Sequence, residues 1–155
     1  MKAGHPAQAK TKVRRDNERE DRQKDGKITL DREIDMQAMD WGRLGWVSSP
    51  VHNRAAQLAI IVGDLNPGMG HSFHKHPGQE EVMCVVSGKV EQWIDKEKRI
   101  LGAGDSAFIP PGVVHASFNA GDTNARVMAI FSPCVGDGFE MVDMAGESPW
   151  NGLRS

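Results

Sequence analysis

The sequence contains no tyrosine and only two cysteines, Cys84 and Cys134, among its 155 residues. Two cysteines are too few for a disulfide framework, which favours a reducing compartment. The absence of tyrosine excludes a phenolic general base. Any catalytic base must therefore be a carboxylate, a histidine or a metal-bound hydroxide.

Long apolar runs and a strong net charge are also missing. No stretch approaches the roughly 20 apolar residues that cross a bilayer, and no apolar run near the N-terminus resembles the core of a signal peptide. The formal net charge of −2 gives no basic footprint for nucleic acid or an anionic membrane surface. We therefore expect a cytoplasmic protein whose partner is a small molecule, not nucleic acid or a membrane.

Charge is concentrated near the start of the chain. Residues 1–35 contain ten of the nineteen Lys and Arg and eight of the twenty-one Asp and Glu, with few aliphatic side chains. Such a segment cannot bury enough apolar area to offset its ordering entropy. The mixed signs favour a solvated, disordered segment over a basic binding arm. Residues 36–155 are predicted to form one domain.

Short apolar runs separated by Gly, Pro and Asp follow from about residue 40, a texture typical of β-proteins with tight turns. No segment with a helical period of useful length interrupts them. These features predict an all-β fold, a sandwich or barrel. Strands are expected at residues 57–64, 70–76, 81–87, 89–94, 99–101, 106–109, 114–119 and 125–132.

Three histidines and one glutamate have spacings that favour a shared site. His74 and His76 are two residues apart on an expected strand, so their side chains point to the same face. A turn at Pro77-Gly78 lets the next strand bring Glu81 beside them. A Pro-Pro-Gly turn introduces the strand with His115, which can supply a third imidazole.

These spacings resemble the two signature motifs of the cupin superfamily. The first motif is Gly, five residues, His, one, His, three or four, Glu, six and Gly, matched by Gly68, His74, His76, Glu81 and Gly88. The second is Gly, five residues, Pro, one, Gly, two, His, three and Asn, matched by Gly104, Pro110, Gly112, His115 and Asn119. Glu80 competes for the glutamate position, but only Glu81 leaves six residues before Gly88.

The resemblance implies a double-stranded β-helix, the cupin jelly-roll barrel, with one divalent transition metal held by His74, His76, Glu81 and His115. Imidazole and carboxylate ligands suit Fe, Mn, Ni, Cu or Zn without selecting one. Four protein ligands leave coordination positions open, as catalytic metal sites do.

Three functions are compatible with such a site. The preferred one is a metal-dependent, dioxygenase-like oxidoreductase that acts on a small oxygenated organic molecule. The alternatives are a Lewis-acid isomerase or decarboxylase of a sugar-derived acid, and a cupin that binds a small ligand without turnover. No catalytic residue beyond the metal ligands is identified.

Alternation on the strand with Glu81 predicts that Met83 and Val85 also face the pocket. Four further residues are candidates for the remaining pocket wall: Phe108, Phe118, Met128 and Phe131. His71 should face away from His74 and His76 if the strand is regular, unless a bulge at Gly70 reverses the alternation.

Kinship with small cupins predicts a homodimer that covers its edge strands. The four tryptophans fit either such an interface or packing on the outside of the barrel: Trp41, Trp46, Trp93 and Trp150.

Overall fold

The computed structural model describes residues 26–154. Most of the charged N-terminal segment, residues 1–25, lies outside this range, so its expected disorder stays a prediction. The described residues contain eleven strands: β1 (Met36–Met39), β2 (Gly42–Ser48), β3 (Ala59–Leu65), β4 (Gly70–Lys75), β5 (Glu80–Ser87), β6 (Lys89–Ile94), β7 (Glu97–Gly102), β8 (Ser106–Ile109), β9 (His115–Asn119), β10 (Ala125–Ser132) and β11 (Val142–Asp143). Three short helices accompany them: η1 (Asp31–Glu33), α2 (Pro50–Asn53) and η2 (Trp150–Gly152).

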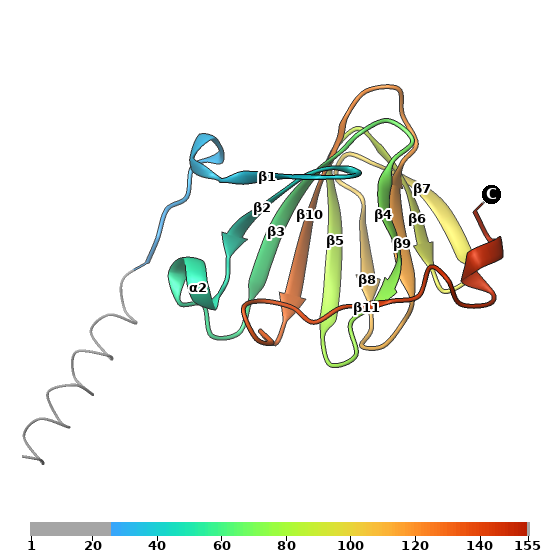
Figure 1. Cartoon of the computed structure of the whole chain (residues 1–155). Coiled ribbons are helices and arrows are strands. Elements are labelled where there is room, and N and C mark those ends of the chain that lie inside the picture. The colour runs from blue at the N-terminus through green and yellow to red at the C-terminus, as the bar shows by residue number, and fades with distance from the viewer. Residues whose placement is uncertain (1–25, 155) are drawn as a thin grey trace, which may run out of the picture.

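The strands form two antiparallel sheets that face each other (Figure 1). The larger sheet has the order β1-β2-β3-β10-β5-β8, and the smaller has the order β11-β4-β9-β6-β7. Sequential strands alternate between the sheets in the centre of the chain, where β4 and β6 flank β9 while β5 pairs with β10 and β8. This is the predicted all-β jelly-roll barrel.

The barrel interior is filled by alternate residues of each strand. On β10 the buried positions are Ala125, Val127, Ala129 and Phe131, and the residues between them are only partly buried. The same period of two operates on β8, where Ala107 and Ile109 are buried while Phe108 is 54% exposed. Inward and outward side chains are therefore fixed by the pleat of each strand.

The C-terminal segment covers the outside of the smaller sheet. Phe73, Trp93 and Phe118 form a buried cluster there, with Met144, Trp150 and Leu153 packed against it. Figure 1 shows the chain after β10 crossing one end of the two sheets before it reaches η2. The strands β4, β9 and β6 of the smaller sheet are consequently covered on their outer face, which explains the aromatic residues at their outward positions.

Strands β1 and β2 are absent from the sequence-based prediction. The exposed β1 has no apolar alternation, and β2 is interrupted by Gly42 and Gly45. A Cβ at Gly45 would come within 2.5 Å of the Ile34 and Met36 side chains, so the chain before and within β1 packs directly on the β2 backbone. This close approach requires glycine, which a propensity argument counts against a strand.

All four tryptophans pack within the chain. Trp41 and Trp46 contact different clusters of the barrel interior, while Trp93 and Trp150 lie in the cluster under the C-terminal segment. The homodimer stays a prediction. No helix among residues 26–154 is long and apolar enough to cross a membrane, and the cytoplasmic location stays a prediction.

Candidate metal centre

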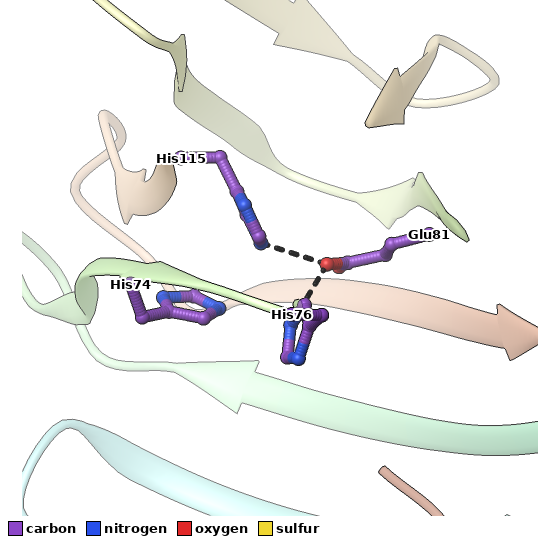
Figure 2. Close-up of side chains that lie close together, drawn as sticks. All are labelled: His74, His76, Glu81 and His115. Carbon is purple, nitrogen blue, oxygen red and sulfur yellow. Dashed lines mark ion pairs between the residues drawn. The ribbon is translucent and has the colours of Figure 1, made fainter. Parts of the chain in front are cut away.

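Four buried side chains converge inside the barrel, and they are His74, His76, Glu81 and His115 (Figure 2). Each offers one ligand atom, and these atoms all lie within 4.8 Å of one another. Two ligands on opposite sides of a transition-metal ion are about 4.2 Å apart, since each metal–ligand distance is about 2.0–2.2 Å. The cluster therefore has the dimensions of a single-ion site.

Short turns bring the four residues together. His74 lies on β4 and His76 follows it, Glu81 lies on β5, and His115 begins β9. His74 faces His115 directly in the register between β4 and β9. The turn before β9 is tied to this site because Gly112 N donates to the backbone oxygen of His76 at 2.8 Å.

The three histidines have the same tautomer. His74 Nδ1 lies 2.6 Å from the Ser72 carbonyl oxygen, and His115 Nδ1 lies 3.0 Å from that of Val113. His76 Nδ1 lies 2.6 Å from the Glu140 carbonyl oxygen. Because a carbonyl only accepts, each Nδ1 carries the hydrogen in a neutral ring, and each Nε2 lone pair is free to bind a metal.

The contacts between Glu81 and the histidines are the test of whether these residues fit a cation. Glu81 Oε2 lies 2.7 Å from His115 Nε2 and 3.2 Å from His76 Nε2, the contacts dashed in Figure 2. None of these three buried atoms has a hydrogen-bond partner. A carboxylate oxygen facing two lone pairs is stable only with a proton or a metal ion between them. The donor set fits a divalent transition metal.

Protonation states suit metal binding. Burial, followed by the charges of His71 and His115, lowers the pKa of His74 well below its usual value, so its ring is neutral at physiological pH. Burial alone would raise the pKa of the Glu81 carboxyl, but hydrogen bonds from His115 and His76 would hold that pKa well below its usual range, which requires a proton on their Nε2 atoms. A divalent metal ion in the place of these protons would likewise keep Glu81 ionised and leave the imidazoles neutral. The neighbouring Glu80 is exposed, in agreement with the choice of Glu81.

His71 faces the site, and the expectation that it faces away is wrong. The register between β4 and β9 shifts between His71 and His74, so both point into the barrel while Phe73 points out. A bulge does reverse the alternation, although it lies after His71 and not at Gly70. The ring centroid of His71 lies 4.1 Å from that of His74. Burial is the largest cause that lowers the pKa of His71 to about 4.

A cavity of about 50 Å³ adjoins the four residues. Of the six residues expected in its wall, Met83 and Phe131 line it. Val85 is buried in the core beyond it, and Phe118 lies on the outer face of β9 under the C-terminal segment. Phe108 and Met128 occupy outward positions of β8 and β10, so the pleat turns them away.

Several lining residues were missed from the sequence. Trp41 and Leu44 come from the turn before β2 and from β2 itself, and Ile61 comes from β3. Phe139 comes from the C-terminal segment, where it stacks on Phe131 with ring centroids 4.7 Å apart. Alternation on β3, anchored on inward Ala59, was a usable signal for Ile61, whereas Phe139 had none.

Comparison with known proteins agrees with this fold. Residues 61–131 match the family model described as "Cupin domain". The chain is 34% identical over 94 residues to a germin-like protein of Morus alba, which covers 57% of this chain and 44% of that protein. It is 32% identical over 102 residues to polyketide synthase CurC of Streptomyces cyaneus, and this alignment covers 66% of this chain and 66% of that protein. The chain spans less than half the length of the plant germin-like proteins that it matches.

Among solved structures, KdgF from Halomonas sp. superposes with a TM-score of 0.65 at 23% identity, over 73% of this chain and 98% of that one. At this identity the likeness concerns the fold alone. The family match and both signature motifs show that this chain has a small cupin domain.

Proposed function

We propose that this chain is a metal-dependent enzyme that holds one divalent transition metal through His74, His76, Glu81 and His115. The observation that carries the proposal is the shared tautomer of the three histidines, whose Nε2 atoms face an ionised carboxylate inside the barrel. A purely structural cluster has no reason to gather unpartnered acceptor atoms in this way.

The proposed reaction is a dioxygenase-like oxidation of a small oxygenated organic molecule. A bound metal would supply Lewis acidity and, if it is redox-active, electrons for dioxygen. Glu81 offsets one positive charge of the ion, and the three imidazoles hold it without adding charge. The apolar wall, including Leu65, Met83 and Phe131, limits water beside the site.

The apolar wall favours this reaction over the alternatives. A sugar-derived acid has several hydroxyl groups, and each would need a polar partner on entering the cavity. The lining side chains outside the four ligands are largely apolar. Dioxygen, in contrast, is small and apolar. A redox-inert ion in the native protein would redirect the proposal to the Lewis-acid or binding function.

Elemental analysis of protein purified without added metal is the first test. We expect about one transition-metal ion per chain, lost in His74→Ala and His115→Ala while circular dichroism shows an intact barrel. His52→Ala is the matched control, because His52 lies on α2 outside the cavity. A full complement of metal in both ligand variants would refute the site. Substrate turnover that continues unchanged without oxygen would refute the oxygenase reaction.

A further inference from the structure

His71 is the cavity-lining histidine that the metal site does not use. It lies beside His74, and its ring centroid is 5.8 Å from that of Trp41. Each of the three candidate metal-binding histidines uses its Nδ1 in a hydrogen bond to a backbone carbonyl. No hydrogen bond between described residues uses a ring nitrogen of His71. Its donor and its acceptor are therefore available to a molecule in the cavity.

Other polar groups in the cavity wall are scarce. Apart from the four ligands, only His71, Ser117 and the indole of Trp41 carry a side-chain nitrogen or oxygen. Ser117 lies opposite His71 in the strand register, but its hydroxyl donates to Gln92 Oε1 at 2.6 Å. His71 and the indole N–H of Trp41 therefore remain for a ligand beyond the metal, and of the two only His71 offers both a donor and an acceptor.

The size and charge of the cavity restrict the ligand further. The cavity volume of about 50 Å³ is far below the roughly 300–1,000 Å³ of ordinary ligand pockets, so the ligand is small. A divalent ion with ionised Glu81 carries a net charge of +1. A singly charged ligand would neutralise it, whereas a doubly charged one would leave an excess negative charge against a wall with no Lys or Arg.

We infer that the site binds a short 2-oxo or 2-hydroxy monocarboxylic acid and that His71 hydrogen-bonds one of its oxygens. Two adjacent oxygens suit a metal with open positions, one negative charge neutralises the site, and a short alkyl group fits the apolar wall. This inference rests on the proposed metal centre. It assigns His71 to substrate contact and not to metal binding.

Calorimetric titration of zinc-loaded protein with pyruvate and with oxalate tests the inference without turnover. The two probes have similar size but differ by one negative charge. Each affinity is divided by the affinity of the same probe for the free aqueous ion. We expect this ratio to be at least tenfold lower for oxalate than for pyruvate. An equal or higher ratio for oxalate would overturn the assigned ligand class.

The role of His71 is tested by substitution in the same assay. Loss of one buried hydrogen bond, about 0.5–1.5 kcal/mol, corresponds to a pyruvate Kd about 2- to 13-fold higher in His71→Ala. His71→Gln, which keeps an amide donor and acceptor, should recover part of this loss, and His52→Ala should bind as wild type does. Unchanged pyruvate affinity in His71→Ala would overturn the contact.

Metal content separates the two proposals. His71→Ala should keep one zinc per chain by elemental analysis, and His115→Ala should lose it. If wild type itself binds no stoichiometric metal, the proposed function fails. If metal binds and is lost in His115→Ala, yet pyruvate does not distinguish wild type from His71→Ala, only the present inference fails.

Discussion

Gln79 connects the C-terminal segment to the candidate metal centre, and its removal is expected to weaken both. The side chain is 1% exposed. Its Nε2 donates to the backbone oxygens of Pro133 at 2.7 Å and Gly138 at 3.1 Å, and its Oε1 accepts from Glu140 N at 2.8 Å. The carbonyl of Glu140 in turn accepts from His76 Nδ1. Gln79 thus orients His76 through one residue of the backbone.

The expected loss in the free energy of unfolding follows from the backbone groups that lose a hydrogen bond in Gln79→Ala. The Pro133 carbonyl and the Glu140 N–H lose their hydrogen bonds, whereas the Gly138 carbonyl still accepts from Val135 N at 3.2 Å; a buried unsatisfied group costs about 1–3 kcal/mol. Water that enters the space of the lost side chain offsets part of this, so we expect a loss of about 3 kcal/mol in the free energy of unfolding. Removing support behind a metal-binding histidine lowers metal affinity about 10- to 100-fold.

Urea unfolding of metal-free protein measures the first effect, and competitive titration against a chromogenic chelator measures the second. Gln79→Glu should be at least as harmful as Gln79→Ala, because its carboxylate would face the Pro133 and Gly138 carbonyls. Glu80→Ala, a change at the exposed neighbour, should affect neither quantity. A folded Gln79→Ala protein with metal affinity within twofold of wild type would refute the proposed link to His76.

The other predictions concern the protonation of His71, the ligand role of Glu81 and the outward position of Phe108 on its strand. With a pKa of about 4 when folded and about 6.5 when unfolded, His71 binds a proton mainly in the unfolded chain between these values. The stability of metal-free wild type should therefore fall by about 2 kcal/mol more than that of His71→Gln between pH 7 and pH 5 in urea titrations; equal losses would contradict this. Glu81→Gln should abolish metal binding in elemental analysis, whereas Glu80→Gln should retain it. Phe108→Ser, at an outward position, should change stability by less than about 1 kcal/mol in thermal unfolding.

The central strands were predictable because their alternation is strong. Three expected ranges, 89–94, 106–109 and 125–132, coincide with β6, β8 and β10. The others differ by one or two residues at their ends. In contrast, β1 and β2 carry weak patterns because glycine at position 45 is required by a tertiary contact. Such contacts are invisible to local propensity.

The convergence of the four candidate ligands was predictable for a related reason. His74 lies on β4, His76 directly follows it, and Glu81 lies on β5 after one turn. Strand alternation and the length of this turn therefore nearly determine their positions. The composition of the pocket wall was harder to predict, because it depends on contacts between segments that are distant in sequence. Phe118 alternates correctly with inward Ser117, but the prediction assigned it to the wrong face. Phe139 reaches the site only through the course of the C-terminal segment.

The orientation of each candidate metal-binding histidine also depends on contacts that are either local or distant in sequence. His74 donates to the carbonyl of Ser72 on its own strand β4, and His115 donates to the carbonyl of Val113 in the turn before β9. Their orientation therefore follows from local structure. His76 donates to Glu140, 64 residues away, and that carbonyl is in place because Gln79 holds the backbone around it. Two ligands of the candidate centre are thus oriented as soon as the β4 and β9 strands form. The third is oriented only when the C-terminal segment is docked, so completion of the site depends on that segment.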